Sequence, residues 1–253
     1  MNYNKKRRSP VSSSRNFMQR KEKFVIGEYY HVYSRTILSL PEFKDNRNAS
    51  RLAKAFLAAN STESAVAFKY LRNNQRPTFK KLAEIAKKGD KLVDILCYVI
   101  MPNHYHLLLR ERVENGITDF VRKSNTSIAK YINIKKDRKG PLFESRFLSK
   151  HIDSNEYLLH LSLYIHLNPL DFIDNKNWRK GNLKKWNIKK GQLMDYPWSS
   201  LKYFLKYRSV DFVVSGTKII EDQFDNNVEY EKFLRDWSEN DLQKLIGVGV
   251  FVN

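Results

Sequence analysis

Cysteine is almost absent from this sequence, and no hydrophobic run is long. Cys97 is the single cysteine among 253 residues, so the chain cannot form an internal disulfide. The longest apolar run, Ile95 to Met101, has about seven residues, whereas a membrane-spanning helix needs about 20. No charged-then-apolar signal segment opens the chain. These absences predict a soluble protein of a reducing compartment, the cytoplasm.

Acidic residues are also in short supply. The chain has 27 Asp and Glu against 46 Lys and Arg, which gives a formal net charge of +19. A charge so far from zero predicts a polyanionic partner, and nucleic acid is favoured, which indicates association with the nucleoid. The competing partner is an anionic membrane surface, but no clean basic amphipathic helix supports a membrane role. A merely basic protein is the plain alternative.

Aromatic residues, in contrast, are plentiful. The 15 Phe, 14 Tyr and 4 Trp, with 42% hydrophobic residues overall, predict a folded protein with a sizeable core. Residues 1–22 are basic and polar and are expected to form a disordered arm. The main domain is expected over 23–208, with a helical insertion near 60–91, and a helical tail over 209–253.

Hydrophobic periodicity predicts alternating strands and helices. Strands are expected over 24–36, 92–101, 104–110 and 147–152. Helices are expected over 47–60, 64–73, 78–88, about 20 residues after 116, 154–168, 200–208 and 228–245. This order favours an α+β sandwich with an antiparallel sheet.

The sharpest chemical feature is His104-Tyr105-His106 in the third predicted strand. Residues i and i+2 of a strand share a face, so both imidazoles project together while Tyr105 points away. Two neutral imidazoles on one face can hold a divalent metal. Taken alone, two solvent-facing histidines, or one held by a core hydrogen bond, explain the pattern at least as well.

The second feature is Tyr164 and Asn168, four residues apart on the helix that ends at Pro169. This spacing puts the phenol and the amide on one helical face. A tyrosine can act as a covalent nucleophile, and an amide oxygen is a suitable ligand for Mg²⁺ or Mn²⁺. The alternative is ordinary packing, since Tyr157, Leu161 and Tyr164 also form an apolar stripe.

Six motifs occur in an order that resembles a known family. They are Tyr30-His31-Val32-Tyr33-Ser34-Arg35, Phe43-Lys44-Asp45, the run from Tyr98 to Leu109, Gly140-Pro141-Leu142-Phe143-Glu144-Ser145-Arg146-Phe147, Tyr164-Ile165-His166-Leu167-Asn168-Pro169 and Trp198-Ser199-Ser200. Over about residues 24–207 the chain resembles the IS200-type single-tyrosine transposases, in the branch associated with repetitive extragenic palindromes. Two departures are a longer connection over 60–91 and a tail after Tyr207, and both bear on substrate choice.

The resemblance implies a ferredoxin-like antiparallel sheet packed with helices, as in nucleases with a histidine–hydrophobic–histidine (HUH) pair. It implies that His104 and His106 bind a metal, Mg²⁺ or Mn²⁺, with Asn168 completing the site. It implies that Tyr164 is the nucleophile, which cleaves single-stranded or hairpin DNA through a 5′-phosphotyrosine and rejoins it without a nucleotide cofactor. His31 is then either a residue behind the ligands, a DNA contact or a packed strand histidine, and His166 is expected to point away from the site.

Basic and aromatic residues near these motifs are candidates for holding DNA. They are Arg35, Arg122, Lys123, Lys130, Arg138, Lys139, Arg146 and Lys150, with Phe143 as a stacking platform. Solvated surface charge is the alternative for each one alone. A DNA-binding regulator that keeps the fold but cuts little is the alternative function, and a replication or conjugation initiator is a third. The protein is expected to be a monomer or a homodimer.

Overall fold

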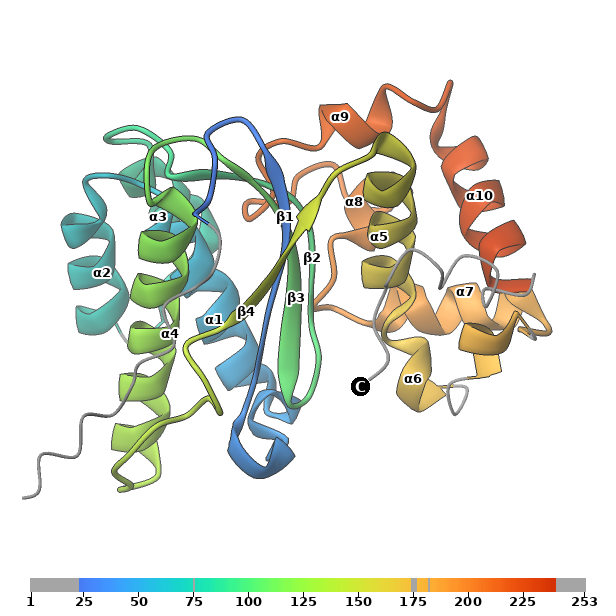
Figure 1. Ribbon diagram of the computed structural model, residues 1–253. Helices are drawn as coiled ribbons and strands as arrows, with labels where there is room; N and C mark the ends of the chain where they lie inside the picture. The colour runs from blue at the N-terminus through green and yellow to red at the C-terminus, as the bar shows by residue number, and fades with distance from the viewer. Residues whose placement is uncertain (1–22, 75, 174–176, 182, 240–253) are drawn as a thin grey trace, which may run out of the picture.

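A computed structural model describes residues 23–74, 76–173, 177–181 and 183–239. Its centre is a four-stranded sheet with a layer of helices on each face (Figure 1). The strands are β1 (Tyr29–Arg35), β2 (Val93–Ile100), β3 (His104–Glu111) and β4 (Leu148–Ile152). The predicted arm over residues 1–22 lies outside the described residues.

The strand order is β2-β3-β1-β4, and every neighbouring pair is antiparallel. One helical connection links β1 to β2 and another links β3 to β4, which is the split β-α-β arrangement of ferredoxin-like folds. The predicted α+β class with an antiparallel sheet is therefore confirmed. The first strand is shorter than expected, because Gly27 turns the chain at φ +90° and its amide donates to the Glu111 carbonyl.

The first helical layer consists of α1 (Asn46–Ala59), α2 (Ser64–Asn73), α3 (Phe79–Ala86) and α4 (Gly116–Lys135). Helices α1 and α4 cover the sheet, and their apolar side chains share one core with Leu107 and Leu109 of β3. The residues expected as an insertion form α2 and α3, which pack on the outer side of α1 through a separate cluster that includes Ala58, Leu71 and Leu82.

The second layer begins with α5 (Asn155–Leu167) and continues through shorter elements. These are α6 (Leu170–Ile173), the 3₁₀ turn η3 (Asn177–Lys180), α7 (Trp186–Asp195), α8 (Leu201–Phe204), α9 (Lys218–Glu221) and α10 (Asn227–Glu239). Helix α8 ends earlier than predicted, and Lys206 follows it with a left-handed φ of 59°. The part of the predicted tail helix beyond residue 239 lies outside the described residues.

Helix α10 packs against α5 and not as a separate appendage. Tyr230 and Leu234 of α10 are buried in the same core as α5. The Tyr230 hydroxyl lies 2.7 Å from His166 Nδ1 and 3.2 Å from the Ser162 hydroxyl. Residues after 208 therefore help to hold α5 against the sheet.

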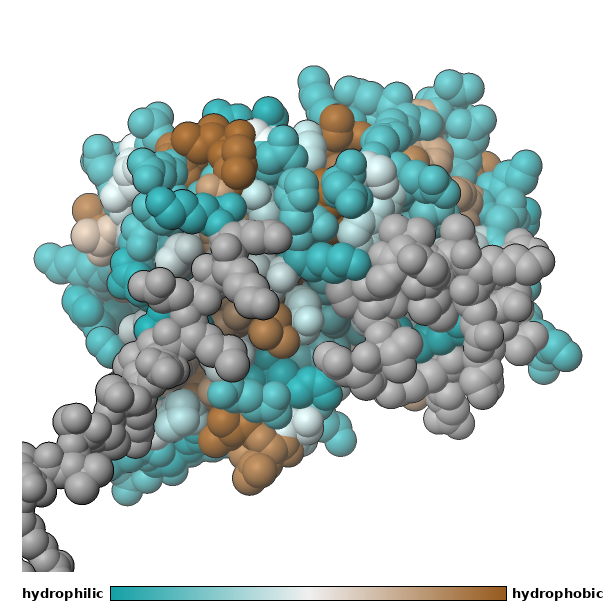
Figure 2. Space-filling model, viewed as in Figure 1, coloured by the Kyte–Doolittle hydropathy of each residue, from teal (hydrophilic) through white to brown (hydrophobic). Residues whose placement is uncertain are grey.

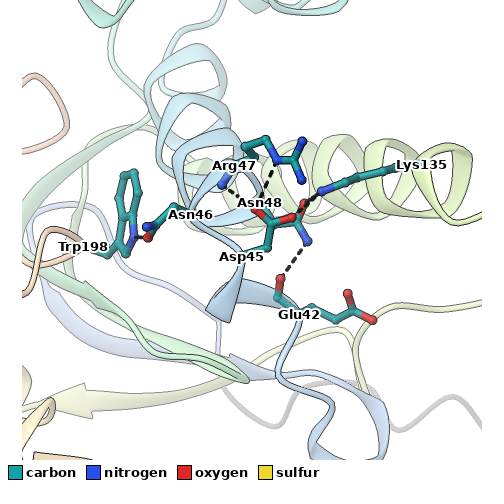
Figure 3. Close-up of polar contacts among 7 residues, drawn as sticks. All are labelled: Glu42, Asp45, Asn46, Arg47, Asn48, Lys135 and Trp198. Atoms are coloured by element: carbon teal, nitrogen blue, oxygen red, sulfur yellow. Dashed lines mark hydrogen bonds and ion pairs between the residues drawn. The ribbon is translucent and has the colours of Figure 1, made fainter.

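The N-terminus of α1 is tied to α4 by a polar network (Figure 3). The Asp45 carboxylate caps α1 by accepting from the Arg47 amide at 2.8 Å. Lys135 of α4 donates to Asp45 at 2.6 Å and to the Asn48 side chain at 2.9 Å. The hydrogen bond to Lys135 is the main cause that lowers the pKa of Asp45 to about 2.

The surface agrees with the charged composition. Figure 2 shows that hydrophilic residues cover most of the visible face and that hydrophobic residues form separate patches. Among the described residues, no helix is long and apolar enough to cross a membrane.

Candidate active site

His104 and His106 lie on the face of β3 that α5 covers. Their ring centroids are 4.9 Å apart, as strand alternation requires of residues two positions apart. Tyr105 points to the opposite face, where it is fully buried and its hydroxyl donates to Asn125 at 2.9 Å.

Each of the two imidazoles is held through its Nδ1 atom. His104 Nδ1 lies 2.6 Å from the Asn103 side-chain oxygen, and His106 Nδ1 lies 2.9 Å from His31 Nε2 on β1. A partner at Nδ1 fixes the ring and leaves Nε2 as the nitrogen that can bind a metal. His31 is thus a neighbour of the ligands, brought there by the pairing of β1 with β3.

Burial makes all three histidines neutral. It is the main cause that lowers the pKa of His31 to about 3 and that of His104 to about 4, with Lys150 and Arg35 adding to the respective effects. Burial also moves the pKa of His106 well below its ordinary value. Neutral imidazole is the form that binds metal ions.

Tyr164 faces the histidines from α5. The helix is capped at its N-terminus by Ser154, whose hydroxyl accepts from the Tyr157 amide at 3.2 Å. The Tyr164 ring meets His106 edge to face, with centroids 5.5 Å apart, and its centroid is 6.5 Å from that of His31. The phenol and both imidazoles of the predicted pair therefore come together within one chain.

Asn168 follows the last residue of α5 and is fully buried. Neither polar atom of its side chain has a hydrogen-bond partner of standard geometry among the described residues. Its amide lies close enough to His104 to act against the lowering of that histidine's pKa. Burying an amide without a hydrogen-bond partner costs folding free energy. The position of Asn168 beside His104 is therefore that expected of a side chain that binds a metal ion together with the histidine.

The two histidine nitrogens provide a three-ligand site for a divalent metal only if the Asn168 oxygen also binds the ion. No group of three His, Cys, Asp or Glu side chains in the described part of the chain could hold a metal ion. His104, His106 and the Asn168 oxygen would together supply three protein ligands, the number typical of catalytic metal sites that keep a position open. The mixed nitrogen and oxygen donors suit Mn²⁺ as well as Mg²⁺.

Three residues of this site were missed by the sequence analysis. Tyr33 shares the face of His31 and its ring centroid lies 5.7 Å from that of His106. The guanidinium of Arg179 on η3 contacts Tyr164 and forms an ion pair with Asp171 of α6. Alternation along β1 could have indicated Tyr33, because it follows His31 by two positions. No periodic pattern marks Asp171 or Arg179, which follow the end of α5.

The basic residues proposed to hold DNA separate into three groups. Arg35 and Lys150 lie on strands beside the histidines, and their charges lower the histidine pKa values. The second group lies on α4, on the opposite side of the sheet from α5, the helix that carries Tyr164 (Figure 1). The third group lies in the loop before β4. The α4 group is Arg122, Lys123 and Lys130, and the loop group is Arg138, Lys139 and Arg146.

Two of these basic residues, and the proposed stacking residue Phe143, have protein contacts that weaken their assignment to DNA. Lys123 donates to the Ser61 carbonyl at 3.4 Å, and Arg138 donates to the Pro141 carbonyl at 2.6 Å. Phe143 is only 8% exposed, with ring centroids 6.3 Å from Phe43 and 6.0 Å from Tyr105. The Phe143 ring is therefore a core residue and is closed to a DNA base, which corrects the stacking role expected from its motif.

His166 lies outside the site. Its two ring nitrogens are 2.7 Å from the Tyr230 hydroxyl and 2.9 Å from the Ser200 hydroxyl, and the side chain is fully buried. Both partners belong to the second helical layer, so His166 supports packing there.

Comparison with known proteins gives a match to one family model and a structural likeness. Residues 67–168 match the family model described as "Transposase IS200 like", and this segment contains His104, His106, Tyr164 and Asn168. A solved structure described as a REP-associated tyrosine transposase bound to a REP hairpin aligns with a TM-score of 0.47 and 13% identity, covering 78% of this chain and 91% of that one. A search of curated proteins gives no match.

Proposed function

Because the chain carries the IS200-like transposase signature over residues 67–168, we propose that it cleaves and rejoins single-stranded, hairpin-forming DNA through Tyr164. The observation that carries the proposal is the meeting of Tyr164 with His106, at 5.5 Å between ring centroids. Beside them lies the fully buried Asn168 amide, which is close to His104 and has no hydrogen bond of standard geometry among the described residues. The net charge of +19 supports a polyanionic substrate.

The roles of the residues follow from their positions. His104, His106 and Asn168 would hold Mg²⁺ or Mn²⁺, which when bound supplies Lewis-acid neutralisation of a phosphate. His31 and Asn103 fix the orientation of the two imidazoles through their Nδ1 atoms. Tyr164 attacks phosphorus, so that a bond from its oxygen to phosphorus forms, the bond from phosphorus to the 3′ oxygen breaks, and a 5′-phosphotyrosine results.

Reversal of the same step rejoins DNA. The phosphotyrosine keeps the phosphate at the ester level, so a free 3′-hydroxyl can attack it without a nucleotide cofactor. Tyr164 and the histidines come from one chain, so a monomer holds the complete set of proposed groups.

The test uses the full chain, Mn²⁺ and a labelled pool of single-stranded hairpin oligonucleotides with randomised flanks. A covalent adduct that survives denaturation is expected with the wild type and is expected to vanish in Tyr164→Phe, which removes only the hydroxyl. Tyr157→Phe is the matched control on the same helix, because its hydroxyl has no hydrogen-bond partner in the described structure. It should form the adduct normally.

Other outcomes would point elsewhere. Loss of the adduct in Tyr33→Phe but not in Tyr164→Phe would move the nucleophile to the neighbouring strand. DNA binding by the wild type without any adduct would instead support the alternative, a regulator that keeps the transposase fold.

A further inference from the structure

Arg179 lies on the reactive end of Tyr164, although it is outside the segment that matches the family model. Its Nη2 atom is 3.4 Å from the Tyr164 hydroxyl oxygen. The guanidinium carbon also lies 4.8 Å from the centroid of the Tyr164 ring. A cation is therefore placed against both the ring and the oxygen of the proposed nucleophile.

The guanidinium is fixed in this position by Asp171. Arg179 Nε donates to Asp171 Oδ1 at 2.8 Å and Nη2 donates to Oδ2 at 2.7 Å, a bidentate pair. Trp178 Nε1 donates to the same carboxylate at 2.9 Å, and the guanidinium carbon lies 4.7 Å from the centroid of the Trp178 ring. Bidentate pairing combined with stacking suits arginine and cannot be reproduced by lysine.

One edge of the guanidinium remains available. Arg179 Nη1 makes no hydrogen bond to any described residue, and a quarter of the side chain is exposed. A purely structural ion pair needs no contact with Tyr164 and no open edge. Arg179 can therefore contact the phenolic oxygen of Tyr164 through Nη2 and, at the same time, donate a hydrogen bond from Nη1 to a phosphate oxygen.

We propose that Arg179 is a catalytic residue that stabilises the Tyr164 oxygen during attack and then binds the phosphoryl group of the phosphotyrosine. In this step the phenolic proton passes to water, the phosphorus–Tyr164 bond forms, the phosphorus–3′-oxygen bond breaks, and the 3′ oxygen takes a proton from water. Arg179 stays protonated, and its positive charge stabilises the negative charge on the Tyr164 oxygen and on the phosphoryl group. Asp171 is the positioning residue for Arg179. This inference rests on the proposed function.

The first experiment measures the rate of adduct formation in a single turnover with the hairpin pool and Mn²⁺. Arg179→Gln is expected to lower the rate about 10²–10³-fold while DNA affinity stays close to that of the wild type. Arg179→Lys should recover only part of the rate, and guanidinium ion should partly rescue Arg179→Gly. The control is Arg208→Gln, which breaks another arginine–aspartate ion pair, a single contact with Asp211 at 3.3 Å, away from Tyr164 and should leave the rate unchanged.

A second experiment needs neither DNA nor metal. An aryl sulfonyl fluoride labels tyrosine oxygens that a nearby cation activates, and peptide mass spectrometry identifies the labelled residue. Labelling of Tyr164 is expected in the wild type and at least about tenfold less in Arg179→Gln. Equal labelling, or a wild-type adduct rate in Arg179→Gln, would overturn the role of Arg179. Absence of the adduct from the wild type, with Tyr164 labelling still dependent on Arg179, would overturn the proposed function alone.

Discussion

The two faces of the central sheet use the same strands for different purposes. The face under α1 and α4 is apolar at Val32, Tyr105, Leu107 and Leu109. The face under α5 places imidazole, phenol and guanidinium groups on the same stretches of β1 and β3. Those groups belong to His31, Tyr33, Arg35, His104 and His106.

The comparison shows how a central strand can tolerate buried polar residues. Burial lowers the pKa of His31 to about 3, which means that its charged form is strongly disfavoured there. Buried polar groups add little stability and cost much when a partner is lost. At these stretches of β1 and β3, the alternate residues Val32, Tyr105, Leu107 and Leu109 supply the apolar burial that the polar positions do not.

The largest expected effect is a difference in unfolding free energy between substitutions on the two faces of the sheet. Leu107→Ala removes a fully buried side chain from the apolar face and should lower the free energy of unfolding by about 2–5 kcal/mol. His104→Ala on the other face should change it by less than about 1 kcal/mol in metal-free protein, because this side chain is partly exposed. Urea unfolding of both variants measures the difference, and equal losses would remove the distinction.

The sequence predicted those parts of the molecule that local patterns determine. The β2–β3 hairpin, the helix starting after Ser154 and the shared face of His104 and His106 all follow from alternation, capping and turn residues. The contact of His31 with His106 depends on the register between β1 and β3, which lie far apart in the chain. Burial of Phe143 depends on Phe43 and Tyr105, and the contact of Arg179 with Tyr164 depends on how η3 packs beside α5. These tertiary contacts have no local signal.

The second prediction concerns α5, the helix that covers the polar face. Burial lowers the pKa of His166 to about 3, so the folded protein holds this histidine neutral. Its contribution to stability is complete above its ordinary pKa of 6.5 and is lost as the pH falls from 6.5 towards 3. Replacement by Gln, which cannot titrate, should reduce the pH dependence of unfolding free energy by about 1.4 kcal/mol per pH unit within that window. Urea unfolding at several pH values measures this slope, and an unchanged slope would contradict the prediction.

The third prediction compares two fully buried histidines. His31→Ala removes the partner of His106 Nδ1 and should weaken Mn²⁺ binding about 10–100-fold by calorimetry. His166→Gln is the control, since His166 is equally buried but has the Tyr230 and Ser200 hydroxyls at its two ring nitrogens. If both variants weaken Mn²⁺ binding equally, burial and not the contact with His106 explains the effect.

The smallest effect concerns the helices over the apolar face. Asp45→Asn keeps a good helix cap but removes the ion pair with Lys135, and should cost less than about 1 kcal/mol, further reduced by salt. The pKa of Asp45 is lowered to about 2, so its contribution is present above pH 3.8 and is lost as the pH falls through 2. The difference in unfolding free energy between wild type and variant should therefore shrink over that range.

The distance along the chain between the groups of the site has a consequence for synthesis. His106 leaves the ribosome roughly 60 residues before Asn168. At about 5–20 residues per second, the nascent chain therefore spends about 3–12 s with both histidines made and without the complete pair of Tyr164, the proposed nucleophile, and Asn168, the proposed third metal ligand. A message cut short between the codons for Glu111 and Tyr164 would yield a chain that contains both strands of the central hairpin but lacks the proposed nucleophile. Under the proposed function, the order of the elements thus delays DNA cleavage until most of the fold has been made.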